Sequence, residues 1–265
     1  MNYMGSKNRI CKYIIPIINN YIKENDIENF YDCFTGGGGN VADKILCKNV
    51  YANDYACDII ELHKTAQTNF DKIPISCNKE EWNEAKDAYK IVLNLLKDKS
   101  YSNFTKEDFN KIGMDLYRIG AIRILASYCS GGFGKSYAKD SKTRKYYNER
   151  WRNYKQQSES LNFKKIKFMS SDYKQIKFQP NSVLYCDSPY KGTNSYDIDK
   201  NFDFDAYYNW LRETSKIYPI FVSEQNLPEE FDKFIIWQKE HNRTIGITNN
   251  FKVTEKLWLI DNRHI

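Results

Sequence analysis

The stretch VLYCDSPY, residues 183–190, joins a short apolar run to a polar turn. Four apolar residues bounded by a turn signal are typical of a buried strand, which would place Asp187 at the carboxyl end of that strand. There the carboxylate can accept one N–H of a ligand's amino group, the backbone carbonyl of Ser188 can accept the other, and the ring of Tyr190 can stack on a flat ligand. Flipped nucleobases are held by edge hydrogen bonds and stacking of this kind. The alternative is a turn that merely follows a strand.

A strand and a glycine loop follow one another near the start of the chain. Residues 29–34, NFYDCF, predict a short strand that runs into TGGGGN at 35–40, and the apolar residues Val41, Ile45 and Leu46 predict a helix after the loop. Four glycines leave the backbone free to adopt positive φ and let a ligand approach closely. This order is typical of nucleotide binding, although the loop is neither a G-x-G-x-x-G nor a P-loop.

An acidic residue follows the next predicted strand, residues 49–52. Asp54 comes after Gly36 at close to the spacing of about 20 residues at which an acidic residue binds ribose hydroxyls in Rossmann-like folds. The alternative is an aspartate that caps a glycine-rich turn.

Four motifs stand in order along the chain: Y-x-G-x-K at 3–7, F-x-G-G at 34–37, Asn-Asp at 53–54 and Asp-Ser-Pro-Tyr at 187–190. In this order and spacing they resemble the Dam-like (D12 class) DNA adenine-N6 methyltransferases, and the resemblance covers nearly the whole chain. It implies an α/β fold, a Rossmann-like class I methyltransferase sheet with an inserted helical target-recognition domain. It also implies an enzyme that uses S-adenosyl-L-methionine to methylate adenine in double-stranded DNA at specific sites.

The resemblance implies two groups of site residues. The cofactor group, which would bind S-adenosylmethionine, comprises Tyr3, Lys7, Asp32, Phe34, Gly36, Gly38, Asp54 and Asp172. The catalytic group, which would hold the target adenine, comprises Asp187, Ser188, Pro189 and Tyr190. Within the cofactor group, Tyr3 and Lys7 are expected to close the pocket. Asp54 is expected to bind the ribose hydroxyls, and Asp172 to contact the adenine of the cofactor.

The chain departs from the family pattern in two places. Ser188 stands where family members usually have a proline. The backbone carbonyl is retained, so the hydrogen bond to the amine is expected to survive, but the stiffness that a proline gives by fixing φ is absent. The glycine loop is also slightly longer than usual, which leaves open which of residues 36–39 take the family's glycine positions.

Residues 69–159 interrupt the alternation of strands and helices and predict a helical insert. Asn78 and Glu81 form a capping pair that opens one helix. Thr105 is expected to open a second helix, with an apolar face that includes Phe109 and continues until the glycines at 131–132. The catalytic domain would then comprise residues 1–68 and 160–265.

The last part of the insert, residues 131–155, is rich in basic and aromatic residues. Basic side chains bind phosphates, and aromatic ones can reach bases. The residues predicted to contact DNA are Lys135, Tyr137, Lys139, Lys142 and Arg144. The aromatic residues of the segment are Phe133, Tyr137, Tyr146, Tyr147, Trp151 and Tyr154. The alternative is a packed helix with a basic outer face.

Beyond the catalytic motif, two further strands are predicted at residues 217–223 and 254–260, the second as half of an antiparallel hairpin. The 265 residues, 41% of them hydrophobic, suffice for one large domain or a domain with an inserted module. No run of 18 apolar residues and no leader pattern occurs, so no membrane association is expected. Seven cysteines without a C-x-x-C pair, and three histidines without a cluster, predict reduced thiols, no metal and a cytoplasmic location. The family resemblance implies a bacterial or phage-encoded protein.

Direct methyl transfer is the predicted chemistry. The adenine amine would attack the methyl sulfonium in line while Asp187 and the Ser188 carbonyl orient the nitrogen and stabilise its developing positive charge. One alternative is methylation of another planar amine, in RNA adenine, cytosine N4 or a glutamine side chain. A second is a catalytically silent DNA-binding protein. A restriction–modification system would add a cognate restriction endonuclease as a partner.

Overall fold

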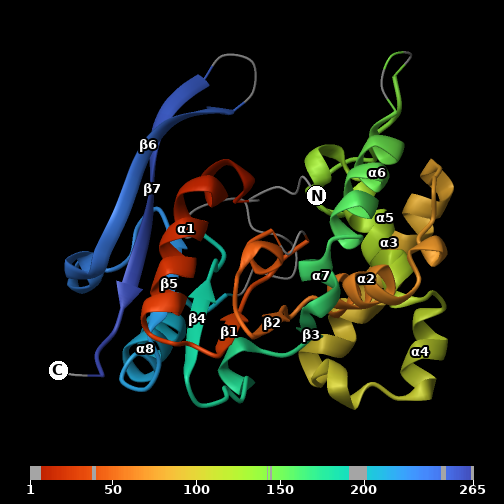
Figure 1. The fold of residues 1–265 in the computed structure, drawn as a ribbon. Helices are drawn as coiled ribbons and strands as arrows, with labels where there is room; N and C mark the ends of the chain where they lie inside the picture. Colours follow the sequence, from red (N-terminus) through yellow and green to blue (C-terminus); the bar gives the residue numbers. More distant parts are fainter. Residues whose placement is uncertain are drawn as a thin grey trace.

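Seven strands form one sheet in the order β3-β2-β1-β4-β5-β7-β6 (Figure 1). The computed structural model describes residues 7–37, 40–141, 143, 145–190, 202–245 and 249–263. The strands are β1 (Asn29–Asp32), β2 (Asn49–Asn53), β3 (Lys167–Met169), β4 (Ser182–Cys186), β5 (Ile220–Glu224), β6 (Ile235–Ile245) and β7 (Asn249–Ile260). β1 to β5 pair in parallel, whereas β7 runs antiparallel to both β5 and β6. The predicted α/β fold with a mostly parallel sheet is therefore confirmed.

The helices that surround the sheet are α1 (Asn8–Glu24), α2 (Cys57–Thr68), α3 (Lys79–Asp98), α4 (Lys106–Ile112), α5 (Leu116–Leu125), α6 (Tyr146–Ser158), α7 (Leu161–Lys165) and α8 (Phe204–Thr214). The central strands are buried on both faces, which explains their nearly continuous apolar sequences. Along β1, Phe30 packs into the core that α1 to α6 share, whereas Tyr31 packs into the core beneath α8. Val183 and Leu184 of β4 divide in the same way.

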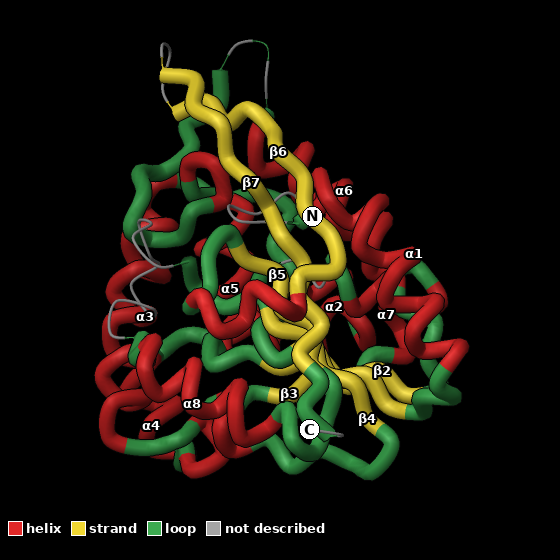
Figure 2. Tube along the Cα trace, turned by 90° about the vertical axis from the view of Figure 1, so that its left-hand side faces the viewer, coloured by secondary structure: helices red, strands yellow, loops and turns green. Residues whose placement is uncertain are grey.

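The hairpin of β6 and β7 extends beyond the sheet. β7 pairs with β5 from Lys256 to Ile260, and Lys256 lies opposite Glu224, the last residue of β5. Residues 249–255 of β7 therefore continue past the carboxyl end of β5 as a ribbon with β6, which rises above the other strands in Figure 1 and Figure 2. The predicted antiparallel hairpin is confirmed, and β7 begins earlier than the sequence indicated.

The prediction of a helix after the glycine loop is wrong. Residues 42–44 form a single 3-10 turn, and Leu46 is 69% exposed. The side chain of Asn19 in α1 donates to the carbonyl of Lys44 and accepts from the N–H of Leu46, at 3.2 and 2.9 Å. These bonds take backbone groups that a continuing helix would have paired.

The helix predicted from Thr105 consists of two helices. α4 ends at Gly113, which adopts a left-handed conformation at φ 69° and donates its N–H to the carbonyl of Phe109. α5 begins after Asp115, and Phe109, which was expected on the apolar face, is 41% exposed. Glycine reaches positive φ without a steric penalty, so it ends a helix whose apolar spacing alone would let it continue. The capping pair of Asn78 and Glu81 at the start of α3 is confirmed.

The helices of residues 69–159 gather beside the sheet in Figure 1, where α5 and α6 pack against α2 and α3 packs against α5. α5 crosses α2 at Gly120, where an added Cβ would lie 2.3 Å from the carbonyl oxygen of Asp58. Arg123 of α5 forms a buried, two-bond ion pair with Asp58 at 2.7 and 3.0 Å, and its guanidinium lies 4.7 Å from the ring centre of Tyr89 in α3. Among the described residues, no helix is long and apolar enough to cross a membrane.

Candidate active site

Polar side chains gather where the parallel strands end. Ligands of open α/β sheets bind outside the carboxyl ends of the strands, so these residues define the candidate site. They are Asp32 at the end of β1, Asn53 and Asp54 at the end of β2, Ser171 and Asp172 after β3, Asp187 after β4, and Glu224 at the end of β5.

Asp187 forms an ion pair with the buried side chain of Lys7. The Lys7 Nζ lies 2.8 Å from Asp187 Oδ1, and the Lys7 side chain is only 6% exposed. The same ammonium donates to the hydroxyl of Tyr190 and lies 4.2 Å from the centre of its ring. The family resemblance implied that Lys7 helps to close the cofactor pocket, and this role stays a prediction. The structure brings Lys7 against two residues of the catalytic motif, at the start of α1.

Glu255 of β7 completes this cluster. The Tyr190 hydroxyl donates to Glu255 Oε2 at 2.8 Å, and the side chain of Gln225 donates to Glu255 Oε1 at 3.2 Å. The Lys7 ammonium lies 3.8 Å from Glu255 Oε2. Sequence analysis did not identify Glu255. The visible signal was a charged residue at a buried position of a strand, between Val253 and Leu257 on the same face.

Burial shifts the protonation of the acidic residues in the site. It raises the pKa of Asp187 to about 6, although the charge of Lys7 opposes the shift. It also raises the pKa of Glu224 to about 8. Burial and, next, the charge of Asp187 raise the pKa of Asp32 well above its ordinary value. Carboxyl groups with shifted pKa values that cluster together are typical of functional sites.

Asp54 shapes the glycine loop. Gly36 is left-handed at φ 59°, and its N–H donates to Asp54 Oδ2 at 2.8 Å. The N–H of Ala56 donates to Asp54 Oδ1, also at 2.8 Å. A carboxylate offers about four acceptor positions, so both oxygens retain capacity for ribose hydroxyls. The loop contact corresponds to the alternative of a capping aspartate, and the ribose contact stays a prediction.

Asn53 joins the ends of three neighbouring strands. Its side-chain nitrogen donates to the carbonyls of Cys33 and Ser171 at 3.2 and 3.0 Å, and its oxygen accepts from the N–H of Ser171 at 3.0 Å. The strand ends that carry Asp54 and Asp172 are fixed relative to each other by these bonds.

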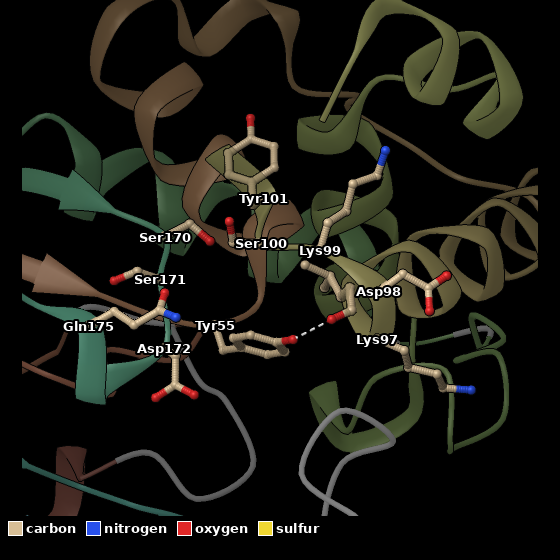
Figure 3. Close-up of a pocket in the computed structure, with 11 residues that line it drawn as sticks. Tyr55, Lys97, Asp98, Lys99, Ser100, Tyr101, Ser170, Ser171, Asp172 and Gln175 are labelled. Atoms are coloured by element: carbon tan, nitrogen blue, oxygen red, sulfur yellow. Dashed lines mark hydrogen bonds between the residues drawn. The ribbon is translucent and has the colours of Figure 1, made fainter. Parts of the chain in front are cut away.

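A cavity of about 220 Å³ lies beside Asp172, between the end of β3 and the end of α3 (Figure 3). Tyr55, Ser170, Ser171, Asp172 and Gln175 line one side, and residues 96–101 line the other. The hydroxyl of Tyr55 donates to the carbonyl of Leu96 at 2.7 Å, which holds the ring at the edge of the cavity. Sequence analysis did not identify Tyr55, although an aromatic residue directly after Asn-Asp was a visible signal.

Three further residues of the two predicted groups are Ser188, Asp32 and Phe34. Ser188 is buried, and the N–H of Phe34 donates to Asp32 Oδ1 at 3.3 Å. The ring of Phe34 packs against Tyr173 and Tyr207 on the α8 side of the sheet. Tyr3 and Gly38 lie outside the described residues.

The aromatic residues of the basic segment are largely structural. Phe133, Tyr147 and Tyr154 are buried. Tyr147 and Tyr154 belong to α6, so the packed-helix alternative holds for these two, whereas Phe133 lies in a turn before that helix. The hydroxyl of Tyr137 donates to the carbonyl of Cys77 at 2.7 Å, and its ring packs against Trp82. Contact of Tyr137 with a base stays a prediction.

The basic residues predicted to contact DNA differ in position. Lys139 is exposed and Lys135 is half-buried, whereas Lys142 and Arg144 lie outside the described residues. Arg150 donates to the carbonyls of Leu125 and Ser127 at 2.9 and 2.7 Å and so stabilises the insert itself. Phosphate contact by Lys135 and Lys139 stays a prediction.

A family model described as D12 class N6 adenine-specific DNA methyltransferase matches residues 3–243. The match takes in Lys7, the glycine loop, the helical insert and the Asp187 motif, and it ends before Glu255. No curated protein matches the chain with significance. Among the described residues, no group of three or more His, Cys, Asp or Glu side chains could hold a metal ion.

Proposed function

The chain belongs to the D12 class N6 adenine-specific DNA methyltransferase family, and from this membership we propose that it transfers a methyl group from S-adenosylmethionine to the N6 amine of an adenine flipped out of duplex DNA. Members of the family methylate adenine in DNA, so the chain is a methyltransferase. The observation that carries the proposal is the Asp187 motif at the carboxyl end of β4, with its half-buried carboxylate and the ring of Tyr190.

In this proposal the catalytic motif positions the amine. The Asp187 carboxylate accepts one N–H and the carbonyl of Ser188 accepts the other, which directs the nitrogen lone pair away from both acceptors. The ring of Tyr190 stacks on the base. Alignment of the reacting atoms and compensation of the positive charge that develops on nitrogen lower the barrier. S-adenosylmethionine, when bound, supplies the electrophilic methyl group.

The residues around the glycine loop fit the cofactor. Gly36 is held in a left-handed conformation that allows close approach, and Asp54 beside it retains acceptor capacity for the ribose. The cavity beside Asp172, at about 220 Å³, is smaller than the ~300–1,000 Å³ of complete ligand pockets. We therefore assign it to one part of the cofactor, the adenine, with the ring of Tyr55 at its edge.

The basic segment supports duplex DNA as the substrate. Lys139 projects from the segment that leads into α6, and Lys135 is partly accessible nearby. We assign these two lysines to phosphate contacts, and target recognition to the insert at residues 69–159. Phosphate contacts position a protein on the duplex without reading its sequence, so recognition of the target requires further side chains.

The test is transfer of a labelled methyl group from S-adenosylmethionine to duplex DNA by the purified protein, followed by digestion to nucleosides. The expected product is N6-methyldeoxyadenosine. The Asp187→Ala variant should still bind the cofactor, but its rate of methyl transfer should fall by roughly 100-fold or more. Loss of one hydrogen-bonding group that stabilises the transition state lowers the rate by about that factor. Label in RNA or on cytosine N4 would favour another planar amine. DNA binding without any transfer would favour a silent DNA-binding protein.

A further inference from the structure

We propose that His63 of α2 and Tyr154 of α6 are positioning residues for the cofactor loop, which tie the conformation of Gly36 to the helical insert. The proposal deepens the proposed function, because it rests on S-adenosylmethionine binding at this loop. α2 and α6 are in contact, so a single side chain can reach from one to the other.

The donor and the acceptor can be assigned in both hydrogen bonds of His63. Its Nε2 lies 3.1 Å from the carbonyl oxygen of Gly36, and its Nδ1 lies 2.7 Å from the hydroxyl of Tyr154. A carbonyl oxygen can only accept, so Nε2 must carry the hydrogen and Nδ1 must be the acceptor. The Tyr154 hydroxyl therefore donates to His63, and His63 donates to Gly36.

The surroundings keep the imidazole neutral and fixed in orientation. His63 and Tyr154 are both completely buried, and the imidazole stacks on the ring of Phe168 at 4.9 Å. The ring of Phe163 meets it edge-on at 5.8 Å. Burial lowers the pKa of His63 to about 4, so the tautomer that donates to Gly36 persists at neutral pH.

Gly36 is consequently held at both of its backbone polar groups. Asp54 accepts from its N–H at 2.8 Å, and His63 donates to its carbonyl. A glycine at φ 59° can adopt many other conformations. Because the two hydrogen bonds exclude these conformations before the cofactor binds, cofactor binding costs less conformational entropy. Tyr154 fixes His63, so α6 of the insert takes part in arranging a loop to which it does not belong.

A buried histidine with two hydrogen bonds could also serve only the stability of the core. The two roles differ in what they predict for cofactor affinity, and the chain offers a matched control. Tyr147 lies in the same helix as Tyr154, is also buried, and donates its hydroxyl to the carbonyl of Pro74 at 2.8 Å. Removal of either hydroxyl costs one buried hydrogen bond, but only Tyr154 contacts His63.

The experiment compares Tyr154→Phe with Tyr147→Phe in the full chain, by calorimetric titration with S-adenosylmethionine and by thermal unfolding without it. Both variants should lose similar thermal stability. Tyr154→Phe should bind the cofactor about 3- to 10-fold more weakly, the value of one hydrogen bond, while Tyr147→Phe binds as the unmodified protein does. Equal affinity in both variants would overturn the inference.

A second pair of variants tests His63 itself. The side-chain amide of His63→Gln can still donate toward the Gly36 carbonyl, whereas His63→Leu cannot, so the glutamine variant should bind the cofactor more tightly than the leucine variant. The Nδ1 acceptor tautomer should also be visible in nitrogen NMR of the cofactor-free protein, and the opposite tautomer would overturn the inference. Unmodified protein that keeps this tautomer yet binds no S-adenosylmethionine would instead count against the proposed function.

Discussion

The ionisation of Asp187 couples the catalytic site to pH. Burial raises its pKa from 3.8 to about 6, so the carboxylate that we propose as the acceptor of an adenine N–H becomes protonated as the pH falls through about 6. We expect kcat/KM to fall about tenfold for each pH unit below that point, because this ratio reports groups of the free enzyme. The measurement is initial methylation rate against pH at low substrate concentration.

The Glu224→Gln variant is the control for this profile. The pKa of Glu224 is raised to about 8, mainly by burial, and this residue is a separate titrating group of the same cluster. Its replacement should leave the acid limb in place. A profile of the unmodified enzyme that stays flat down to about pH 5 would contradict the assignment of an ionised Asp187 as the acceptor.

Asp54 offers a second prediction at the scale of one residue. Asp54→Asn exchanges one acceptor oxygen for a donating amide, which then faces the N–H of either Gly36 or Ala56. S-adenosylmethionine binding should weaken by about 1.5–3 kcal/mol, because the variant no longer offers hydrogen bonds to a charged group. DNA affinity without cofactor should not change, and both quantities can be measured by titration.

Asp203→Asn is the matched control for Asp54→Asn. Asp203 caps α8 by accepting from the N–H of Ala206 at 2.9 Å, so its replacement also removes a carboxylate from a backbone N–H. This change should lower stability by only about 0.3–1 kcal/mol, because asparagine can still cap the helix and only the charge at its amino end is lost, and it should leave cofactor affinity intact. Equal weakening of cofactor binding in the two variants would show that Asp54 acts only through the stability of the fold.

At the scale of elements, the sequence predicted the strands better than the helix ends. Strand residues are buried on both faces and so form continuous apolar runs, and polar residues follow directly, which is why Asp32, Asp54 and Asp187 were found together. The break at Gly113 was missed because the apolar spacing continues across it. The prediction of a helix after the glycine loop was wrong because Asn19 of α1 forms hydrogen bonds with backbone groups that such a helix would need.

The site residues that sequence analysis missed have partners far along the chain. Glu255 accepts from Tyr190, 65 residues away, and His63 pairs with Tyr154, 91 residues away. A local pattern cannot report such pairs, since they depend on which elements pack together. Tyr55 was missed for another reason, because only the cavity beside it gives the ring a function.

The crossing of α2 and α5 gives a prediction for Gly120. Glycine-to-alanine changes within helices ordinarily stabilise by about 1 kcal/mol. Here the new Cβ would lie 2.3 Å from the backbone oxygen of Asp58, which cannot move aside as a side chain can. Gly120→Ala should therefore lower the free energy of unfolding by about 1–3 kcal/mol in urea titrations.

Lys90→Ala in α3 is a suitable control for that measurement. Lys90 is exposed and forms an ion pair with exposed Asp87 across one turn, so its replacement should change stability by less than about 0.5 kcal/mol. A stabilised Gly120→Ala variant would mean that the two helices can separate without cost.

At the scale of the whole molecule, sheet and insert share one hydrophobic core. The same cluster contains Ile14 of α1, Ile60 of α2, Val92 of α3, Ile122 of α5 and Val183 of β4. The buried pair of Arg123 and Asp58 joins α5 of the insert to α2. We therefore expect the insert and the sheet to unfold together rather than as separable units. The boundaries of a recognition domain at residues 69 and 159 stay a prediction.

The charge of the whole chain, +6, gives a prediction for DNA binding. Lys135→Gln combined with Lys139→Gln should weaken binding to all duplexes and reduce the salt slope by up to about 0.9 for each phosphate that the variant no longer neutralises. The measurement is a titration of binding against salt concentration. An unchanged slope would mean that these two lysines are solvated surface residues that do not contact phosphates.

Lys48 and Lys216 provide the control for the salt titration. They precede β2 and β5 and so lie at the amino ends of the parallel strands, away from the candidate site, in exposed pairs with Glu28 and Glu213. The double Lys48→Gln, Lys216→Gln variant removes the same charge. It should leave the salt slope close to that of the unmodified protein.

The position of β4 beside β1 has a consequence for the nascent chain. Asn29 of β1 and Pro180, just before β4, are hydrogen-bonded partners 151 residues apart. At ~5–20 residues per second, a ribosome needs roughly 8–30 s to deliver β4 after β1 has been made. Throughout that interval one edge of β1, which is buried in the finished fold, has no neighbouring strand. Unpaired strand edges promote aggregation. We therefore expect the nascent chain to be most prone to aggregation when translation stalls within the insert.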